Sequence, residues 1–336
     1  MNPQTQKSRR TWIAVAAAMF VVAVAGCQHH KVAYAGPPVY VAAPPPAAVA
    51  RATDVLAGEL ISDADVQPLA RGPLHEAFAA PVAYEPAAGI VVARESPAPV
   101  EELPPELKPE GDTVVWIPGY WAWDDELGDF LWVSGLWRVP PPGCEWVPGY
   151  WAPVAGGYQW VSGYWRPVAA GVAYLPAPPP SLEAGPNVPA PGPDFIWVPG
   201  CWLYSAGRYA WQPGSWIDAR PDRIWVPASY SWTPRGCVYV PGYWDWPLET
   251  RGLVFAPVRF RRPARVRHRI RYRPTIVIET HALTVCLFIA PRRSHYVFGD
   301  YFGVRFSTRG YRPWFDHHRR DRWYDPVLFH RRWRAS

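Results

Sequence analysis

A six-residue pattern, W-x-P/S-G-x-W, recurs along the middle of this chain and constrains its fold more than any other feature. The segment from 113 to 247 holds 17 of the 21 Trp residues. Successive units start 14 residues apart, or 16 where a longer turn intervenes, with one gap of 37. The eight units span 116–121, 132–137, 146–151, 160–165, 197–202, 211–216, 225–230 and 239–244, and a degenerate ninth copy spans 255–260.

The period of 14 predicts one β-strand plus one turn for each unit. The gaps carry turn-forming pairs such as Gly156-Gly157 and Ala206-Gly207, and they hold no long amphipathic helical pattern. We therefore expect a mainly β fold, an antiparallel array of β-hairpin repeats. A disordered Pro/Ala-rich tether would precede this array, and an Arg-rich C-terminal region would follow it.

The Pro-Gly or Ser-Gly pair inside each unit leaves two arrangements open. Residues five apart in a regular strand face opposite sides, which would separate the two Trp of a unit. A β-bulge at this pair would reset the parity, because bulges tolerate proline and one type needs a glycine with positive φ. Alternatively, the pair forms a type II turn between strands, although Ala228 at the glycine position disfavours a turn. We prefer the bulged strand.

The Trp side chains fit two roles. They can form the core, because residues 113–260 contain few Leu and Ile and a buried aromatic hides roughly 150–250 Å². They can also stack on sugar rings or lipid head groups. We favour the core, and both roles are compatible if one Trp of each unit faces outward. The candidate stacking residues are Trp116, Trp121, Trp132, Trp137, Trp146, Trp151, Trp160, Trp165, Trp197, Trp202, Trp211, Trp216 and Trp244.

The unit resembles the WXXGXW (also YXWGXW) repeat of exported bacterial proteins, notably those of planctomycetes. The resemblance covers about 113–247 and implies an envelope location and a repeat fold, but no catalytic activity. The departures from the pattern are Ala228, Tyr230 and Tyr239, and they suggest terminal or interface copies.

The N-terminus predicts a secreted, membrane-anchored protein. Basic residues precede an apolar run from Ile13 to Ala25, which suits a signal peptide but is too short to span a bilayer. The run ends in Val24-Ala25-Gly26-Cys27, which resembles the lipobox of bacterial lipoproteins. The resemblance implies cleavage before Cys27 and acylation of this residue. Because Gln28 is not aspartate, we expect an outer-membrane lipoprotein, facing the periplasm or the cell surface.

Composition divides the chain into six segments. They are a signal peptide (1–26), an Ala/Pro-rich tether (27–112), a first repeat block (113–167), a Pro-rich spacer (168–194), a second repeat block (195–260) and an Arg/aromatic-rich region (261–336).

The C-terminal region is strongly basic. From 28 to 258 the chain has 12 Lys and Arg against 23 Asp and Glu, whereas from 259 to 336 it has 19 Arg against 5 acids. A strand here would align five guanidinium groups, from Arg265, Arg267, Arg269, Arg271 and Arg273. They would bind anionic lipid or acidic polysaccharide, or dock on the acidic body of the same chain. Secretion disfavours nucleic acid as the partner.

We find no pattern that predicts catalysis, a cofactor or a resident metal ion. The repeats contain no histidine, and Arg residues interrupt the one metal-like cluster, which runs from Asp316 to His330. Four cysteines remain after Cys27, namely Cys144, Cys201, Cys237 and Cys286, and they can form two disulfides or stay reduced. The sequence thus predicts a non-enzymatic envelope lipoprotein that acts as a scaffold or interaction module. The alternative is a carbohydrate-binding module for cell-wall or surface polysaccharide. The sequence does not indicate the oligomeric state.

Cys27→Ser should abolish incorporation of a fatty-acid analogue, because acylation requires the thiol at this position. Metabolic labelling of cells that express either form tests this, and Cys144→Ser is the matched control that should keep the label. Persistent labelling of the Cys27→Ser form would exclude the proposed anchor.

Overall fold

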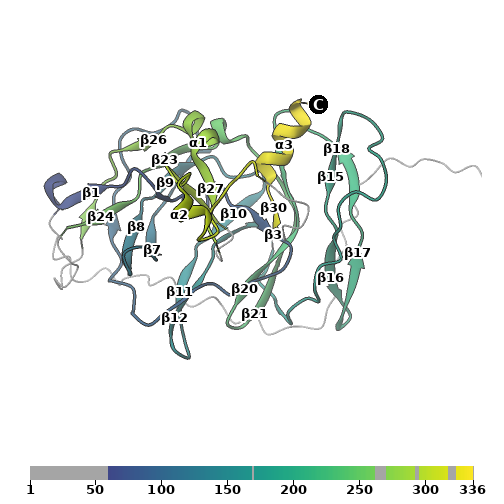
Figure 1. Cartoon of the computed structure of the whole chain (residues 1–336), viewed down its shortest axis with the longest axis horizontal. Coiled ribbons are helices and arrows are strands. Elements are labelled where there is room, and N and C mark those ends of the chain that lie inside the picture. Colours follow the sequence, from purple (N-terminus) through teal and green to yellow (C-terminus); the bar gives the residue numbers. More distant parts are fainter. Residues whose placement is uncertain (1–59, 169, 262–269, 292–294, 317–322, 336) are drawn as a thin grey trace, which may run out of the picture. The chain divides into compact units, whose positions relative to one another are not determined.

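Two successive repeat units face each other across each β-hairpin. The computed structural model describes residues 60–168, 170–261, 270–291, 295–316 and 323–335. In hairpin 1, β6 (Val115–Ile117) pairs with β9 (Leu136–Arg138), and β7 (Tyr120–Asp124) pairs with β8 (Asp129–Val133). Each first Trp of one unit thus lies opposite the second Trp of the other, as Trp116 does with Trp137. The antiparallel hairpin array is confirmed (Figure 1).

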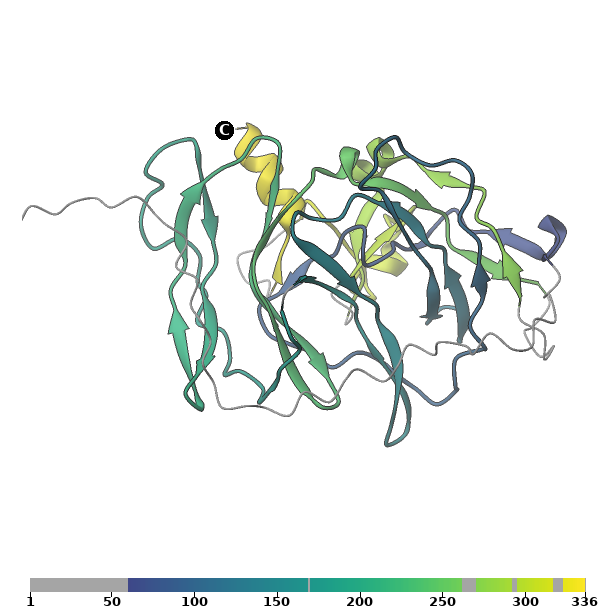
Figure 2. The same cartoon turned by 180° about the vertical axis from the view of Figure 1, so that it is seen from behind.

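The remaining three hairpins repeat this pairing (Figure 2). Hairpin 2 consists of β10 (Cys144–Val147), β11 (Tyr150–Val154), β12 (Gly157–Val161) and β13 (Tyr164–Pro167). Hairpin 3 consists of β15 (Phe195–Val198), β16 (Cys201–Ser205), β17 (Arg208–Gln212) and β18 (Ser215–Asp218). Hairpin 4 consists of β19 (Ile224–Val226), β20 (Ser229–Thr233), β21 (Gly236–Val240) and β22 (Tyr243–Asp245).

The eight facing aromatic pairs have nearly the same geometry. Their ring centroids lie 5.1–5.4 Å apart, and the rings are tilted or edge to face. Such pairs stabilise by about 0.5–1.5 kcal/mol beyond the area they bury. The repeat therefore supplies two aromatic cross-links to every hairpin.

Both strands of a hairpin are interrupted at the same level, and the interruption is neither a bulge nor a turn. The register is the same on both sides of it, because Trp116 pairs with Trp137 and Trp121 with Trp132. No extra residue is inserted, so the bulge that we preferred is wrong. Two glycine-containing breaks instead face each other within one continuous hairpin.

The glycine of the unit is required for space and not for backbone conformation. None of the seven repeat glycines has a positive φ. A Cβ on any of them would lie 2.3–2.9 Å from a ring atom of the first Trp of the facing unit. At Gly163, for example, it would lie 2.3 Å from Trp146. The ring thus covers a position where only glycine fits.

The three departures from the repeat meet in one half of hairpin 4. Ala228 replaces the glycine, and the aromatic residue of the facing unit that would cover it is Tyr239 in place of Trp. Tyr239 pairs in turn with Tyr230. The smaller ring compensates for the added methyl group, so the three substitutions form one local adjustment.

Residues 60–112 fold onto the rest of the chain, which differs from the tether predicted for 27–112. Short strands from this segment pair with later ones: β1 (Val66–Pro68) with β24 (Val258–Phe260), β2 (Gly72–Pro73) with β28 (Tyr296–Phe298), β3 (Val82–Ala83) with β30 (Trp323–Tyr324), β4 (Val91–Val92) with β12, and β5 (Glu101–Glu102) with β25 (Arg271–Tyr272). The segment is poor in large apolar residues, but Leu74 and Phe78 are fully buried. Residues 27–59 lie outside the described part of the chain.

The C-terminal region completes the core. Leu283, Leu287 and Trp314 pack in the same cluster as Phe78 and Trp165. The region contains β26 (Val277–Ile278), β27 (Leu287–Ile289), β29 (Arg312–Pro313), α1 (Thr280–Cys286), α2 (Val304–Ser307) and α3 (Pro326–Ala335). Further elements before it are β14 (Tyr174–Leu175), the 3-10 helix Leu248–Thr250 and β23 (Gly252–Phe255). Among the described residues, none of the helices has the length and apolar character needed to cross a membrane.

The compensation in hairpin 4 predicts a coupled pair of substitutions. Tyr239→Trp alone should destabilise the protein by about 1–3 kcal/mol, because the larger ring overpacks against the Ala228 methyl group. Ala228→Gly together with Tyr239→Trp should recover most of this loss. Urea unfolding of both single variants and the double variant measures the coupling, and purely additive effects would rule out the contact.

Candidate functional site

The break in hairpin 1 holds a buried carboxylate. Glu102 accepts hydrogen bonds from the backbone N–H of Gly119 at 2.6 Å and of Gly135 at 3.0 Å. It also accepts one from the indole N–H of Trp132 at 3.0 Å. All these donors are uncharged, so the site recognises a carboxylate by the directions of its N–H groups.

Hairpins 2 and 3 hold a carboxylate in the same way. In hairpin 2, the indole of Trp160 and the backbone N–H of Gly163 donate to separate oxygens of Glu76, both at 2.9 Å. In hairpin 3, Trp197 donates to one oxygen of Glu183 at 3.0 Å and the Gly200 N–H donates to the other. The first Trp and the glycine of a single unit, three residues apart, therefore bind the two oxygens of one carboxylate.

The segments that carry these glutamates cross the hairpins, and we call residues 73–77, 98–108 and 176–188 the straps. In four of the units the second Trp donates to a backbone carbonyl of a strap. Trp165 donates to Ala77, and Trp202 donates to Pro180. In hairpin 3 the strap continues to Val188, whose carbonyl accepts from Trp216 at 3.0 Å. The third strap is part of the Pro-rich spacer predicted for 168–194. This part of the spacer is therefore bound along hairpin 3.

Burial shifts the pKa values of the first two glutamates. Desolvation raises the pKa of Glu102 to about 7, although the hydrogen bonds from Trp132, Gly135 and Gly119 act in the opposite direction. Desolvation likewise raises the pKa of Glu76, whose Oε1 also lies 3.5 Å from Nδ1 of His295.

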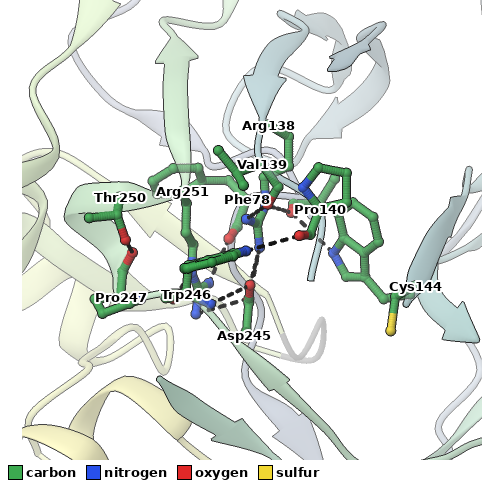
Figure 3. Close-up of polar contacts among 12 residues, drawn as sticks. Phe78, Arg138, Val139, Pro140, Cys144, Asp245, Trp246, Pro247, Thr250 and Arg251 are labelled. Carbon is green, nitrogen blue, oxygen red and sulfur yellow. Dashed lines mark hydrogen bonds and ion pairs between the residues drawn. The ribbon is translucent and has the colours of Figure 1, made fainter. Parts of the chain in front are cut away.

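A buried ion-pair cluster joins hairpins 1 and 4 to the first strap (Figure 3). Arg138 binds both oxygens of Asp245, at 2.6 and 2.7 Å, and Arg251 lies 3.0 Å from the second oxygen. Arg138 also donates to the strap carbonyl of Ala77 at 2.9 Å, and Arg251 donates at 2.6 Å to the carbonyl of Phe78, which follows the strap directly. Removal of one partner from such a cluster costs about 3–5 kcal/mol, because the remaining charge stays buried.

A cavity of about 200 Å³ lies beside hairpin 2. Its lining includes all four Trp of this hairpin, the segment 76–90 and parts of hairpin 4, among them Trp232. Ser162, Ser229 and Ser231 add hydroxyl groups to a lining of aromatic, Ala and Pro side chains, which also includes Glu76, Asp245 and Arg251. Aromatic faces with a few polar groups are typical of small-molecule sites.

The thirteen candidate stacking Trp side chains are all buried or half-buried. Trp121, Trp132, Trp160, Trp165 and Trp197 have at most 8% of their surface exposed. Several indole N–H groups are also used within the chain, as described above. Stacking on an external ligand stays a prediction for these residues, and the structure favours their role in the core.

Two of the five candidate anion-binding arginines are described, and both lie near acids of the same chain. Arg271 lies 3.2 Å from Glu101 and Arg273 lies 3.7 Å from Glu106. Arg265, Arg267 and Arg269 fall outside the described residues, so binding to an external anion stays a prediction.

The other candidate groups have structural surroundings. No disulfide joins the four described cysteines, and burial raises the pKa of the Cys144 thiol to about 11. Asp325, from the metal-like cluster, accepts the Leu328 N–H at 2.8 Å and caps α3. Among the described residues, no group of three or more His, Cys, Asp or Glu is arranged to hold a metal ion.

The three strap glutamates are not among the candidate residues that the sequence indicates. Each follows a proline by three residues, at Pro73, Pro99 and Pro180, but Glu145 follows Pro142 in the same way, so this spacing alone does not predict a bound carboxylate.

Comparison with known proteins yields one match. A family model described as the WXXGXW repeat, in two copies, matches residues 114–138, 146–166, 192–216 and 220–246. Each match falls on one hairpin, so the two-copy model corresponds to the structural unit. No curated protein and no solved structure matches the chain.

Near pH 4.5, Glu102→Gln should lower the free energy of unfolding by about 1–3 kcal/mol, because the amide N–H₂ cannot accept the hydrogen bonds that both oxygens of Glu102 receive. Urea unfolding measures the loss. Glu101→Gln, at the neighbouring position, is the matched control. The side chain of Glu101 is exposed and makes only a surface ion pair, so this change should lower the free energy of unfolding by less than about 1 kcal/mol. Equal effects of both changes would show that the carboxylate at the break is unimportant.

The raised pKa of Glu102 predicts a pH dependence. Between its ordinary value of 4.5 and about 7, the folded state binds more protons at this site than the unfolded state. The contribution of Glu102 to stability is therefore fully present below pH 4.5 and declines as the pH rises to about 7. The difference in unfolding free energy between wild type and Glu102→Gln should shrink across this window. A constant difference from pH 4 to 8 would contradict the raised pKa.

Proposed function

Because this chain is a WXXGXW-repeat protein, we propose that it is a non-enzymatic structural and interaction module of the bacterial cell envelope. Acylation at Cys27 would anchor it to the outer membrane. One observation carries the proposal: the Trp side chains of the repeat pair with one another, and in three hairpins an indole N–H donates to a glutamate of a strap segment of the same chain. The repeat thus organises polypeptide segments around a rigid aromatic framework.

The charged groups nearest the cavity support a role without catalysis. Glu76 accepts from Trp160 and Gly163, and Asp245 binds two arginines. These hydrogen bonds and ion pairs hold the straps and hairpins together. The buried carboxylates thus serve the architecture.

A second candidate function, carbohydrate binding, is favoured by the cavity beside hairpin 2. Its Trp and Tyr walls and its serine hydroxyls suit the apolar face and the hydroxyl groups of a sugar ring. In this alternative, the sugar binds inside the cavity and not on exposed Trp faces.

Fluorescence quenching separates the two functions. For a structural module, we expect iodide to quench the Trp emission weakly and cell-wall polysaccharide to leave the quenching unchanged, because the repeat Trp are buried or half-buried. For the carbohydrate-binding alternative, polysaccharide should shift the emission. Trp232→Ala, within the cavity lining, should then abolish the shift, and Trp333→Ala, outside that lining, should preserve it. Strong iodide quenching that polysaccharide relieves would overturn the structural role.

A further inference from the structure

The three occupied sites indicate what kind of ligand a repeat unit binds. The glutamates come from three distant parts of the chain, yet each presents one carboxylate to a first Trp and to the glycine three residues later. The straps share little sequence besides the spacing P-x-x-E, as in 73–76, 99–102 and 180–183. The recognition therefore resides in the repeat unit and in this short strap pattern.

We propose that the W-x-x-G part of the repeat is a carboxylate receptor, and that hairpin 3 binds an extended P-x-x-E peptide as a separate ligand once its own strap is removed from the site. This inference is independent of the envelope role proposed above.

Hairpin 3 is the place where a detached P-x-x-E segment fits best. The first two straps contribute to the core, since Leu74 is 1% and Val100 is 8% exposed. The side chains of the third strap are largely exposed, since Leu182 is 60% and Val188 is 54% exposed. This strap is held by Glu183, by the carbonyls that accept from Trp202 and Trp216, and by its Ser181 N–H, which donates to Glu85 at 3.1 Å. These contacts require no specific side chain other than the glutamate.

Two natural contrasts define the requirements. In hairpin 4 the glycine of the first unit is Ala228, and the indole N–H of Trp225 is buried without a partner. The indole N–H of Trp116 of hairpin 1 is also buried without a partner although its unit keeps Gly119. Among the described residues, no carboxylate therefore reaches the Trp of the unit that lacks the glycine, and the glycine alone does not ensure one at the indole. The fourth P-x-x-E segment, 142–145, lies within hairpin 2 itself, and its Glu145 pairs with Arg166. A bound glutamate must therefore come from a segment outside the hairpin.

The test replaces residues 178–188 of the full mature chain by a Gly/Ser linker of equal length and adds the peptide PPPSLEAGPNV, which is this strap. The indole N–H resonance of Trp197 reports binding by NMR. We expect a saturable shift toward its position in the intact protein. The peptide with Gln in place of Glu should bind at least about tenfold more weakly, because a charge-assisted hydrogen bond contributes roughly 1.5–3 kcal/mol. Equal binding of both peptides, or no saturation by the Glu peptide, would overturn the proposal.

Two controls complete the test. The intact chain should not bind the peptide at the same concentrations, because its own strap has a high effective concentration. Should the linker variant not fold, Glu183→Gln in the intact chain serves instead, with Asp218→Asn, an exposed carboxylate on β18 of the same hairpin, as control. Indole exchange of Trp197 should accelerate at least tenfold in Glu183→Gln only, and unchanged exchange would contradict the receptor. Both readouts are independent of Cys27 labelling and of polysaccharide binding, so either proposal can fail alone.

Discussion

The contact between a Trp ring and the glycine of the facing repeat unit is the constraint on which the rest of this structure depends. The ring occupies the space of a Cβ, so it fixes which residue can lie beneath it and holds the two strands in one register. The same contact interrupts the strand, and at the interruption the glycine N–H is directed to a carboxylate and not to the β-ladder. The six-residue unit thus provides both the packing of a Trp ring on a glycine and the hydrogen bond from a glycine N–H to a carboxylate.

The straps connect three of the four hairpins to the rest of the folded body. A two-stranded hairpin is marginally stable alone, and the straps accept hydrogen bonds from several of the indole N–H groups. Burial of the carboxylates is costly, which the raised pKa of Glu102 reflects. The directional N–H donors offset this cost, and the Arg138–Asp245–Arg251 cluster adds a second buried polar connection between the first and last hairpins.

Hairpin 4 illustrates how far the repeat can vary while its fold is retained. Its Trp225–Trp244 pair keeps the common geometry, whereas its other half combines Ala228 with two tyrosines. The pairing of strands survives, but the carboxylate receptor does not operate there within the described chain. Strand pairing therefore tolerates a smaller aromatic residue, and carboxylate binding makes a stricter demand on the Trp and the glycine. This difference separates the structural part of the repeat from the part that we assign to recognition.

The sequence by itself determined the β-hairpin array, its period and the positions of its turns, because alternation of a 14-residue unit with turn residues is a local property. It also indicated that the Trp residues supply the core, since the repeat region offers few Leu and Ile. Only the tertiary structure decided that units pair in twos, that glycine serves close approach without positive φ, and that residues 60–112 are part of the body. These features arise from contacts between residues far apart in the chain. Glu102 and Gly135 are an example: nothing local to either residue predicts that one carboxylate meets the other's N–H, because the hairpin must form before its break can bind a strap.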